Sequence, residues 1–207
     1  MKLINPRNQI QLGSVSTSRT ELIDLIKAWL AISIAFAILL RSSLPSPNFL
    51  ISFMVASLSV GFGFIAHELA HKVVAQKYGC QAEFRSWDKM LILAVVMSFF
   101  GFIIAAPGAV MISGPVGKKR NGKISAAGAI ANLIVAGLFL SLLLIPVTGV
   151  FFLIARYGFM INTWLALFNM LPIGIFDGKK VLNWSKPVYA TIVIVSIAFL
   201  ALQGIIF

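Results

Sequence analysis

Residues 67–71 read His-Glu-Leu-Ala-His, and they contain the only two histidines of the chain, His67 and His71. Residues four apart on an α-helix lie on the same face, so both imidazoles can bind one Zn²⁺ ion. Glu68 lies beside His67 and can take a proton from a water molecule bound at such an ion. The alternatives are a chance match or a structural role, but ionisable groups within an apolar helix are costly and usually serve a function.

A catalytic zinc site usually has three protein ligands, and the chain has no third histidine. Cys80 is one candidate, but it follows Gly79, which is expected to end the helix. Four of the six acids are expected elsewhere, in a solvated loop or as charges at a helix N-terminus: Glu83, Asp88, Glu21 and Asp24. Besides Glu68, this leaves Asp177. It lies at the end of an apolar run, and its alternative role is that of a surface turn residue.

The composition excludes a water-soluble domain. Of the 207 residues, 59% are apolar and 11% are charged, and the mean hydropathy is +0.97, whereas soluble domains have about 45–50% apolar and about 25% charged residues. The net charge of +11 indicates basic loops on the cytoplasmic side of a membrane, with no nucleic-acid partner. Cys80 is the only cysteine, which excludes an intrachain disulfide.

The apolar runs predict an all-α polytopic membrane protein that forms a single domain over residues 1–207. A span needs about 20 apolar residues, and five runs qualify: 22–40, 49–78, 126–145, 147–175 and 187–207. Ser18 and Glu21 fit a capping box that starts the first of these helices. Residues 1–17 show no strong periodicity, and residues 114–123 are basic and glycine-rich, typical of a surface loop.

The apolar run 90–106 is either a sixth span or a re-entrant segment. If it dips into the membrane and returns, 15 of the 17 Lys and Arg residues lie on one side, and only Arg41 and Arg156 lie on the other. If it crosses, the division becomes 9 to 8. The positive-inside rule favours the re-entrant topology, with five full crossings and a cytoplasmic N-terminus. The active site would then open toward the cytoplasm.

The position of Asp177 tests this topology independently. His67 lies near the cytoplasmic end of its helix, so Asp177 can reach the same ion only if an even number of crossings separates them. The re-entrant topology gives two crossings, whereas a sixth span would give three. The charge distribution and the third ligand therefore favour the same topology.

Three motifs resemble those of the site-2 protease family of intramembrane zinc metalloproteases. The first is the H-E-x-x-H motif at residues 67–71. The second is Asn-x-x-Pro-x-x-x-x-Asp-Gly at residues 169–178, and the third, weaker match is Ala-Gly-Ala-Ile-Ala-Asn at residues 127–132. Ala129 stands where the family often has proline, and Phe176 stands where leucine commonly precedes Asp-Gly. We expect no appended soluble regulatory or PDZ domain of the kind that many relatives carry, because the sequence leaves no room for one.

This resemblance implies a set of residue roles. His67, His71 and Asp177 would bind one Zn²⁺ per chain, and Glu68 would be the catalytic base. Asn169 and Asn132 would hold the substrate backbone or the developing oxyanion. The implied fold has five to six transmembrane helices around a three-helix catalytic core at about residues 49–180, with a short β or re-entrant hairpin after the H-E-x-x-H helix.

The resemblance also implies a substrate class and a location. The substrates would be transmembrane segments of other proteins, cleaved within the cell membrane, and the oligomeric state stays open. An extended substrate could pair with the edge of the hairpin at residues 90–113 by strand addition. The alternatives are a non-enzymatic zinc-binding channel or transporter, and an inactive relative of the proteases. A channel would spread its ionisable groups over several spans, whereas this chain clusters them.

Overall fold

The computed structural model describes residues 9–13, 15–41, 48–103 and 107–207. The helices are α1 (Arg19–Leu40), α2 (Phe49–Ala56), the π-helical segment η2 (Ser57–Gly61), α3 (Phe62–Lys77), α4 (Asp88–Ser98), α5 (Lys118–Leu143), α6 (Gly149–Asn169), α7 (Asp177–Trp184) and α8 (Lys186–Ile206). The strands are β1 (Gln9–Leu12), β2 (Val15–Ser18), β3 (Gln81–Ser86) and β4 (Gly108–Ser113).

Five helical stretches among the described residues are long and apolar enough to cross a membrane. They are α1, the continuous stretch Phe49–Lys77 that contains α2, η2 and α3, and then α5, α6 and α8. Ser18 caps the first of them, because its side chain accepts a hydrogen bond from the Glu21 amide. The chain is therefore an all-α polytopic membrane protein, as the sequence predicts.

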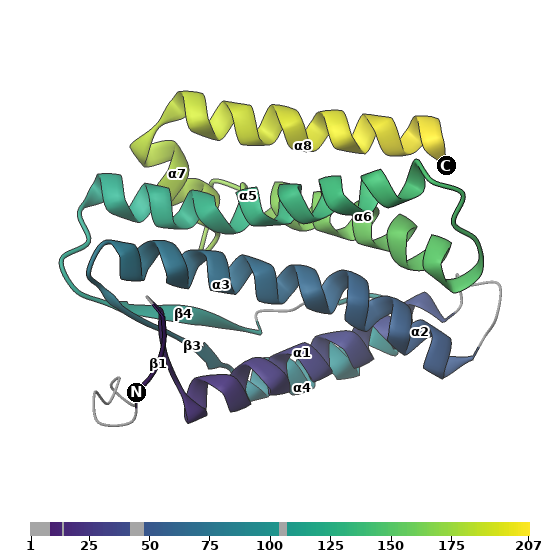
Figure 1. Cartoon of the computed structure of the whole chain (residues 1–207), viewed down its shortest axis with the longest axis horizontal. Coiled ribbons are helices and arrows are strands. Elements are labelled where there is room, and N and C mark those ends of the chain that lie inside the picture. The colour runs from purple at the N-terminus through teal and green to yellow at the C-terminus, as the bar shows by residue number, and fades with distance from the viewer. Residues whose placement is uncertain (1–8, 14, 42–47, 104–106) are drawn as a thin grey trace.

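The long helices lie side by side, and α3 lies in the middle of the bundle (Figure 1). It packs against α5, which in turn packs against α6 and α7, while α1 packs against α2, α4 and η2. The outermost helix is α8, at the top of the view. The β1–β2 hairpin, the end of α3, the start of α5 and α7 all lie at the left end of the bundle, so the basic sequences of α5 and α7 share one end.

The segment between α3 and α5 begins and ends with two strands that pair with each other. Strands β3 and β4 pair antiparallel, with Ser86 opposite Gly108 and Gln81 opposite Ser113, so the chain returns to the point where it left β3. Helix α4 has 11 residues, a length of about 16 Å, whereas the hydrocarbon core of a membrane is about 30 Å thick. The hairpin predicted after the H-E-x-x-H helix is confirmed, whereas its re-entry into the membrane stays a prediction; residues 104–106 of the run lie outside the described residues.

Two expected loops are ordered elements. Residues 81–86 form strand β3 instead of a solvated loop, because they pair along their whole length with β4. The basic residues 118–123 form the first turns of α5, where Gly122 lies against the Trp184 side chain of α7. This contact with α7 allows α5 to begin before the apolar run that the sequence shows. In the N-terminal stretch, whose sequence shows no strong periodicity, β1 and β2 pair antiparallel.

Candidate metal centre and its cavity

Three side chains far apart in the sequence meet inside the bundle. His67 and His71 lie one turn apart on α3, and their Nε2 atoms are 2.9 Å from each other. Asp177 is the first residue of α7, and its Oδ2 lies 2.9 Å from Nε2 of His71 and 3.5 Å from Nε2 of His67. All three residues are buried. They form the group of candidate metal ligands found in the described part of the chain.

A tight turn at the end of α6 brings Asp177 to this point. Helix α6 ends at Asn169, and Gly174 in the following turn has a φ of +54°, a conformation that favours glycine. Gly178 packs directly on the chain where α6 ends, because a Cβ there would lie 2.2 Å from the carbonyl oxygen of Met170. The Asp-Gly pair therefore lets α7 begin next to the end of α6, with the carboxylate aimed at α3.

Helix α5 orients both histidines. Nδ1 of His67 is 2.6 Å from Oδ1 of Asn132, and Nδ1 of His71 is 2.7 Å from the carbonyl oxygen of Ile124. A carbonyl oxygen only accepts hydrogen bonds, so each Nδ1 carries the proton and each Nε2 can present a lone pair to a metal. Between these two contacts lies Gly128, where a Cβ would be 2.5 Å from Cε1 of His71. The absence of a side chain lets α5 approach the imidazoles.

The separations of the three donor atoms fit a zinc ion. With Zn–N and Zn–O bonds of about 2.0–2.1 Å, tetrahedral ligand atoms lie about 3.3 Å apart. The two histidine nitrogens and the Asp177 oxygen are separated by 2.9, 2.9 and 3.5 Å. Two imidazoles and one carboxylate leave one tetrahedral position open, which is the donor set of catalytic zinc sites. The residues present therefore fit this metal.

Asp177 is held as a carboxylate. The carboxylate lies between the two imidazoles and the positively charged ammonium group of Lys180, which favours the ionised form. Its second oxygen, Oδ1, accepts a hydrogen bond from Nζ of Lys180 at 3.2 Å. The ionised form is the one that binds a metal.

A cavity of about 700 Å³ opens beside the three donors. Glu68 lines it, and the backbone of Val110 in β4 lies within hydrogen-bonding reach of the Glu68 carboxylate. Most of the wall is apolar and comes from α1, α3, β4 and α6, with Phe36 and Trp164 among the larger side chains. The carboxylate of Glu68 therefore shares an apolar chamber with the donor cluster and with strand β4.

The two predicted asparagines occupy different environments. Asn169 lines the cavity at the end of α6, and its Nδ2 donates to the carbonyl of Leu165 at 2.9 Å. Asn132 also borders the cavity but is fully buried. Its Oδ1 faces His67, and its Nδ2 donates to Gly63 and Asn162. This arrangement favours a role in orienting His67, while Asn169 has the position expected of a residue that contacts substrate.

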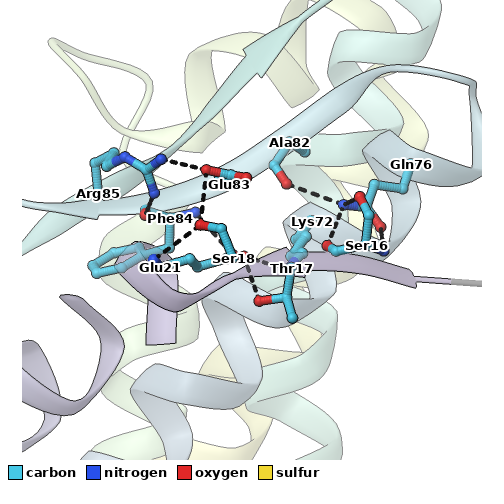
Figure 2. Close-up of polar contacts among 10 residues, drawn as sticks. All are labelled: Ser16, Thr17, Ser18, Glu21, Lys72, Gln76, Ala82, Glu83, Phe84 and Arg85. Carbon is cyan, nitrogen blue, oxygen red and sulfur yellow. Dashed lines mark hydrogen bonds and ion pairs between the residues drawn. The ribbon is translucent and has the colours of Figure 1, made fainter. Parts of the chain in front are cut away.

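A buried polar cluster beside the site has no signature in the sequence (Figure 2). Lys72, which follows His71, forms an ion pair with Glu21 at the start of α1, and both side chains are buried. The other oxygen of Glu21 accepts a hydrogen bond from the Phe84 amide in β3 at 2.9 Å. Glu21 is therefore a link between α1, α3 and β3, beyond its expected role as a helix N-terminal charge.

The same cluster corrects the expectation for Glu83. This residue was expected in a solvated loop, but it is 1% exposed and accepts hydrogen bonds from Ser18 and Arg85. Strand pairing buries it against the start of α1. Asp88, by contrast, is exposed as expected, and hydrogen bonds from Ser86 and Lys27 lower its pKa.

The fold and the site define a polytopic membrane protein with a buried two-histidine, one-aspartate cluster of the kind that binds a metal. No protein-family model and no solved structure matches the chain. A protein of Methanocaldococcus jannaschii named "Putative zinc metalloprotease MJ0611" is 42% identical over 179 residues, which cover 84% of this chain and 90% of that protein. The chain belongs to the same family as this zinc metalloprotease relative.

Proposed function

We propose that this protein is an intramembrane zinc metalloprotease that hydrolyses peptide bonds within or near transmembrane segments of other proteins. The observation that carries the proposal is the convergence of His67, His71 and Asp177 with Glu68 at the wall of one cavity inside the helix bundle. The relative that is named a zinc metalloprotease supports the metal and the reaction class. The resemblance to the site-2 protease family supports cleavage in the membrane.

The cavity supports an apolar polypeptide as substrate. Its wall is mostly apolar and is formed by helices that the composition places in the membrane. Four residues of β4 line it, namely Gly108, Ala109, Val110 and Ile112, and β3 covers only one edge of β4. An extended substrate segment could therefore add to the free edge of β4 among the described residues.

The residues supply the proton transfers and the positioning. When bound, zinc polarises the scissile carbonyl and makes water a stronger nucleophile at neutral pH. Glu68 takes a proton from the attacking water and delivers it to the nitrogen of the leaving amine, which returns Glu68 to its ionised form. His67, His71 and Asp177 hold the ion, and Asn169 is placed to bind the substrate backbone. A helical substrate must first unwind, because its backbone amides are already hydrogen-bonded.

The proposal includes an orientation in the cell membrane. The N-terminus and the opening of the active site face the cytoplasm, because the basic starts of α5 and α7 lie at the same end of the bundle as the β1–β2 hairpin. The donor cluster lies near this end, between α3, α5 and α7. Water could then reach Glu68 from the cytoplasmic side.

Purified protein in detergent, mixed with a model transmembrane substrate, tests the proposed activity. A zinc chelator and the substitution Glu68→Gln should each abolish cleavage, while Glu68→Gln should keep a full complement of zinc. Asp88→Asn is the matched control, because it removes an exposed carboxylate that does not line the cavity and should leave cleavage unchanged. Cleavage that survives both the chelator and Glu68→Gln would overturn the mechanism.

A further inference from the structure

A chain of hydrogen bonds begins at the π-helical segment η2. In a π-helix the backbone hydrogen bonds shift from the α-helical pattern, and such segments are frequent at functional sites. Here the carbonyl oxygen of Ser59 accepts a hydrogen bond from Nδ2 of Asn162 on α6, at 3.2 Å. Segment η2 ends six residues before His67. A side chain of α6 is thus connected to the backbone of the helix that carries the candidate ligands.

The amide of Asn162 has one orientation that satisfies its neighbours. Its Nδ2 donates to the carbonyl of Gly158 at 2.8 Å as well as to that of Ser59. A carbonyl oxygen only accepts, so the amide nitrogen must face this pair and Oδ1 must face the other way. Asn162 is fully buried, where an inverted amide would leave these groups unpaired at a cost. Two backbone carbonyls therefore fix the direction of Oδ1.

The orientation of Asn162 in turn fixes that of Asn132. Oδ1 of Asn162 accepts a hydrogen bond from Nδ2 of Asn132 at 3.1 Å, and the carbonyl of Gly63 accepts a second one at 3.2 Å. With its nitrogen occupied by two acceptors, Asn132 must point its own oxygen at Nδ1 of His67. Only a protonated Nδ1 can donate to this oxygen, which leaves Nε2 as the metal-binding atom.

The packing around Asn162 leaves no space for a side chain at residue 63. A Cβ at Gly63 would lie 1.8 Å from Oδ1 of Asn162, so this turn of α3 can pass the amide only because residue 63 has no side chain. Asn162 does not line the cavity, and neither does Gly63. The hydrogen bond to Asn132 is therefore the side-chain route from Asn162 to the site, beside its contacts with the backbone of η2 and α3.

We propose that Asn162 is a positioning residue that, through Asn132, fixes the orientation and tautomer of the His67 ring and so directs Nε2 toward the metal. The inference rests on the proposed function in one respect, since it takes His67 as a zinc ligand. It assigns a role to a residue outside the three motifs. His71 is independent of this chain of contacts, because its Nδ1 donates to Ile124.

Exchange of the ring N–H protons of the two histidines with water can be measured directly by NMR. Protein labelled with ¹⁵N-histidine shows only two imidazoles, from His67 and His71, and His71→Gln assigns them. In metal-free protein, Asn162→Leu should speed exchange of the His67 Nδ1 proton with water about fivefold or more. Exchange at His71 should not change. The matched control is Thr163→Val, which removes a buried hydrogen bond to Phe159 on the same helix but has no contact with Asn132.

Zinc affinity and a double substitution test whether Asn162 acts through Asn132. Asn162→Leu should weaken zinc binding about tenfold, as found for residues that support metal ligands. In the Asn132→Leu background, the same substitution should cause no further loss, whereas a merely structural role would give additive losses. If the Asn162→Leu variant does not fold, the Asn162→Ala variant is measured in its place.

The outcomes are distinguishable. Unchanged exchange at His67 with Asn162→Leu, equal changes at His67 and His71, or additive losses of zinc affinity would each overturn the positioning role. Wild-type protein that binds no zinc would refute the proposed function, while the exchange of the His67 ring proton would still report on Asn162.

Discussion

Lys72 and Glu21 form a buried ion pair that connects the residue after His71 to the first turn of α1. Removing one partner of a buried pair leaves an uncompensated charge and costs about 3–5 kcal/mol. We expect Glu21→Gln to lower the free energy of unfolding by about this amount, and the double variant with Lys72→Met to recover part of it. Unfolding by denaturant in detergent measures both, and Asp88→Asn, at the exposed Lys27–Asp88 pair, should change little. Equal stability of Glu21→Gln and wild type would show that the pair contributes nothing.

Asp177 is the expected third ligand. Asp177→Asn keeps the size of the side chain but removes the charged oxygen that lies 2.9 Å from Nε2 of His71. We expect the zinc content of the purified variant, measured by atomic absorption, to fall well below one per chain. Full occupancy would mean that another group completes the site.

Gly128 should be essential for metal binding because of its position against both imidazoles. A Cβ there would lie 2.5 Å from Cε1 of His71 and 2.6 Å from Cε1 of His67, so Gly128→Ala should displace the rings and weaken zinc affinity by an order of magnitude or more. Gly137→Ala on the same helix meets no atom within 4 Å. Competition with a chelating dye compares the two. Similar affinities would disprove the tight fit of α5 against the histidines.

Val110 tests strand addition to β4. The substitution Val110→Pro removes the backbone N–H that lies near Glu68, on the edge away from β3. We expect cleavage of a transmembrane substrate to fall much more than zinc binding, because a substrate strand would lose a backbone partner. Val110→Ala keeps the N–H and should cleave normally. Equal loss of cleavage and zinc would argue against pairing at this edge.

The re-entrant topology predicts the side from which engineered cysteines are labelled. In a Cys80→Ser background, Lys89→Cys and Lys118→Cys flank the segment and should both react with a membrane-impermeant reagent from the cytoplasmic side. Leu144→Cys, in the exposed turn between α5 and α6, should react only from the opposite side. Labelling of positions 89 and 118 from opposite sides would show that the segment crosses the membrane.

Local signals predicted the spans and the donor residues well. The i, i+4 spacing of His67 and His71 is a property of a single helix, and the helix start at Ser18 follows from its capping pattern. Asp177 was chosen by elimination among the acids, and the topology favoured by the charge distribution agreed with this choice. Each of these inferences uses neighbours in sequence or the sidedness of the membrane, both of which can be read without coordinates.

Contacts between distant segments were the part that could not be predicted. The burial of Glu83 depends on pairing of β3 with β4 and on Ser18 of the N-terminal hairpin, and no local pattern encodes such a meeting. The same holds for Asn162, whose partners lie on η2 and α5. The substrate contacts of Asn132 and Asn169 and the cytoplasmic orientation stay predictions.

The division of the donor atoms between α3 and α7 has a consequence for biosynthesis. His67 and His71 are synthesised more than one hundred residues before Asp177, and membrane proteins are made from the N-terminus onward. During that interval a nascent chain has two of the three donors, and the groups of α5 that orient them arrive only later. The arrangement of three donors seen here cannot form until α5, α6 and the start of α7 have been made, so a nascent fragment that ends earlier lacks the complete metal site.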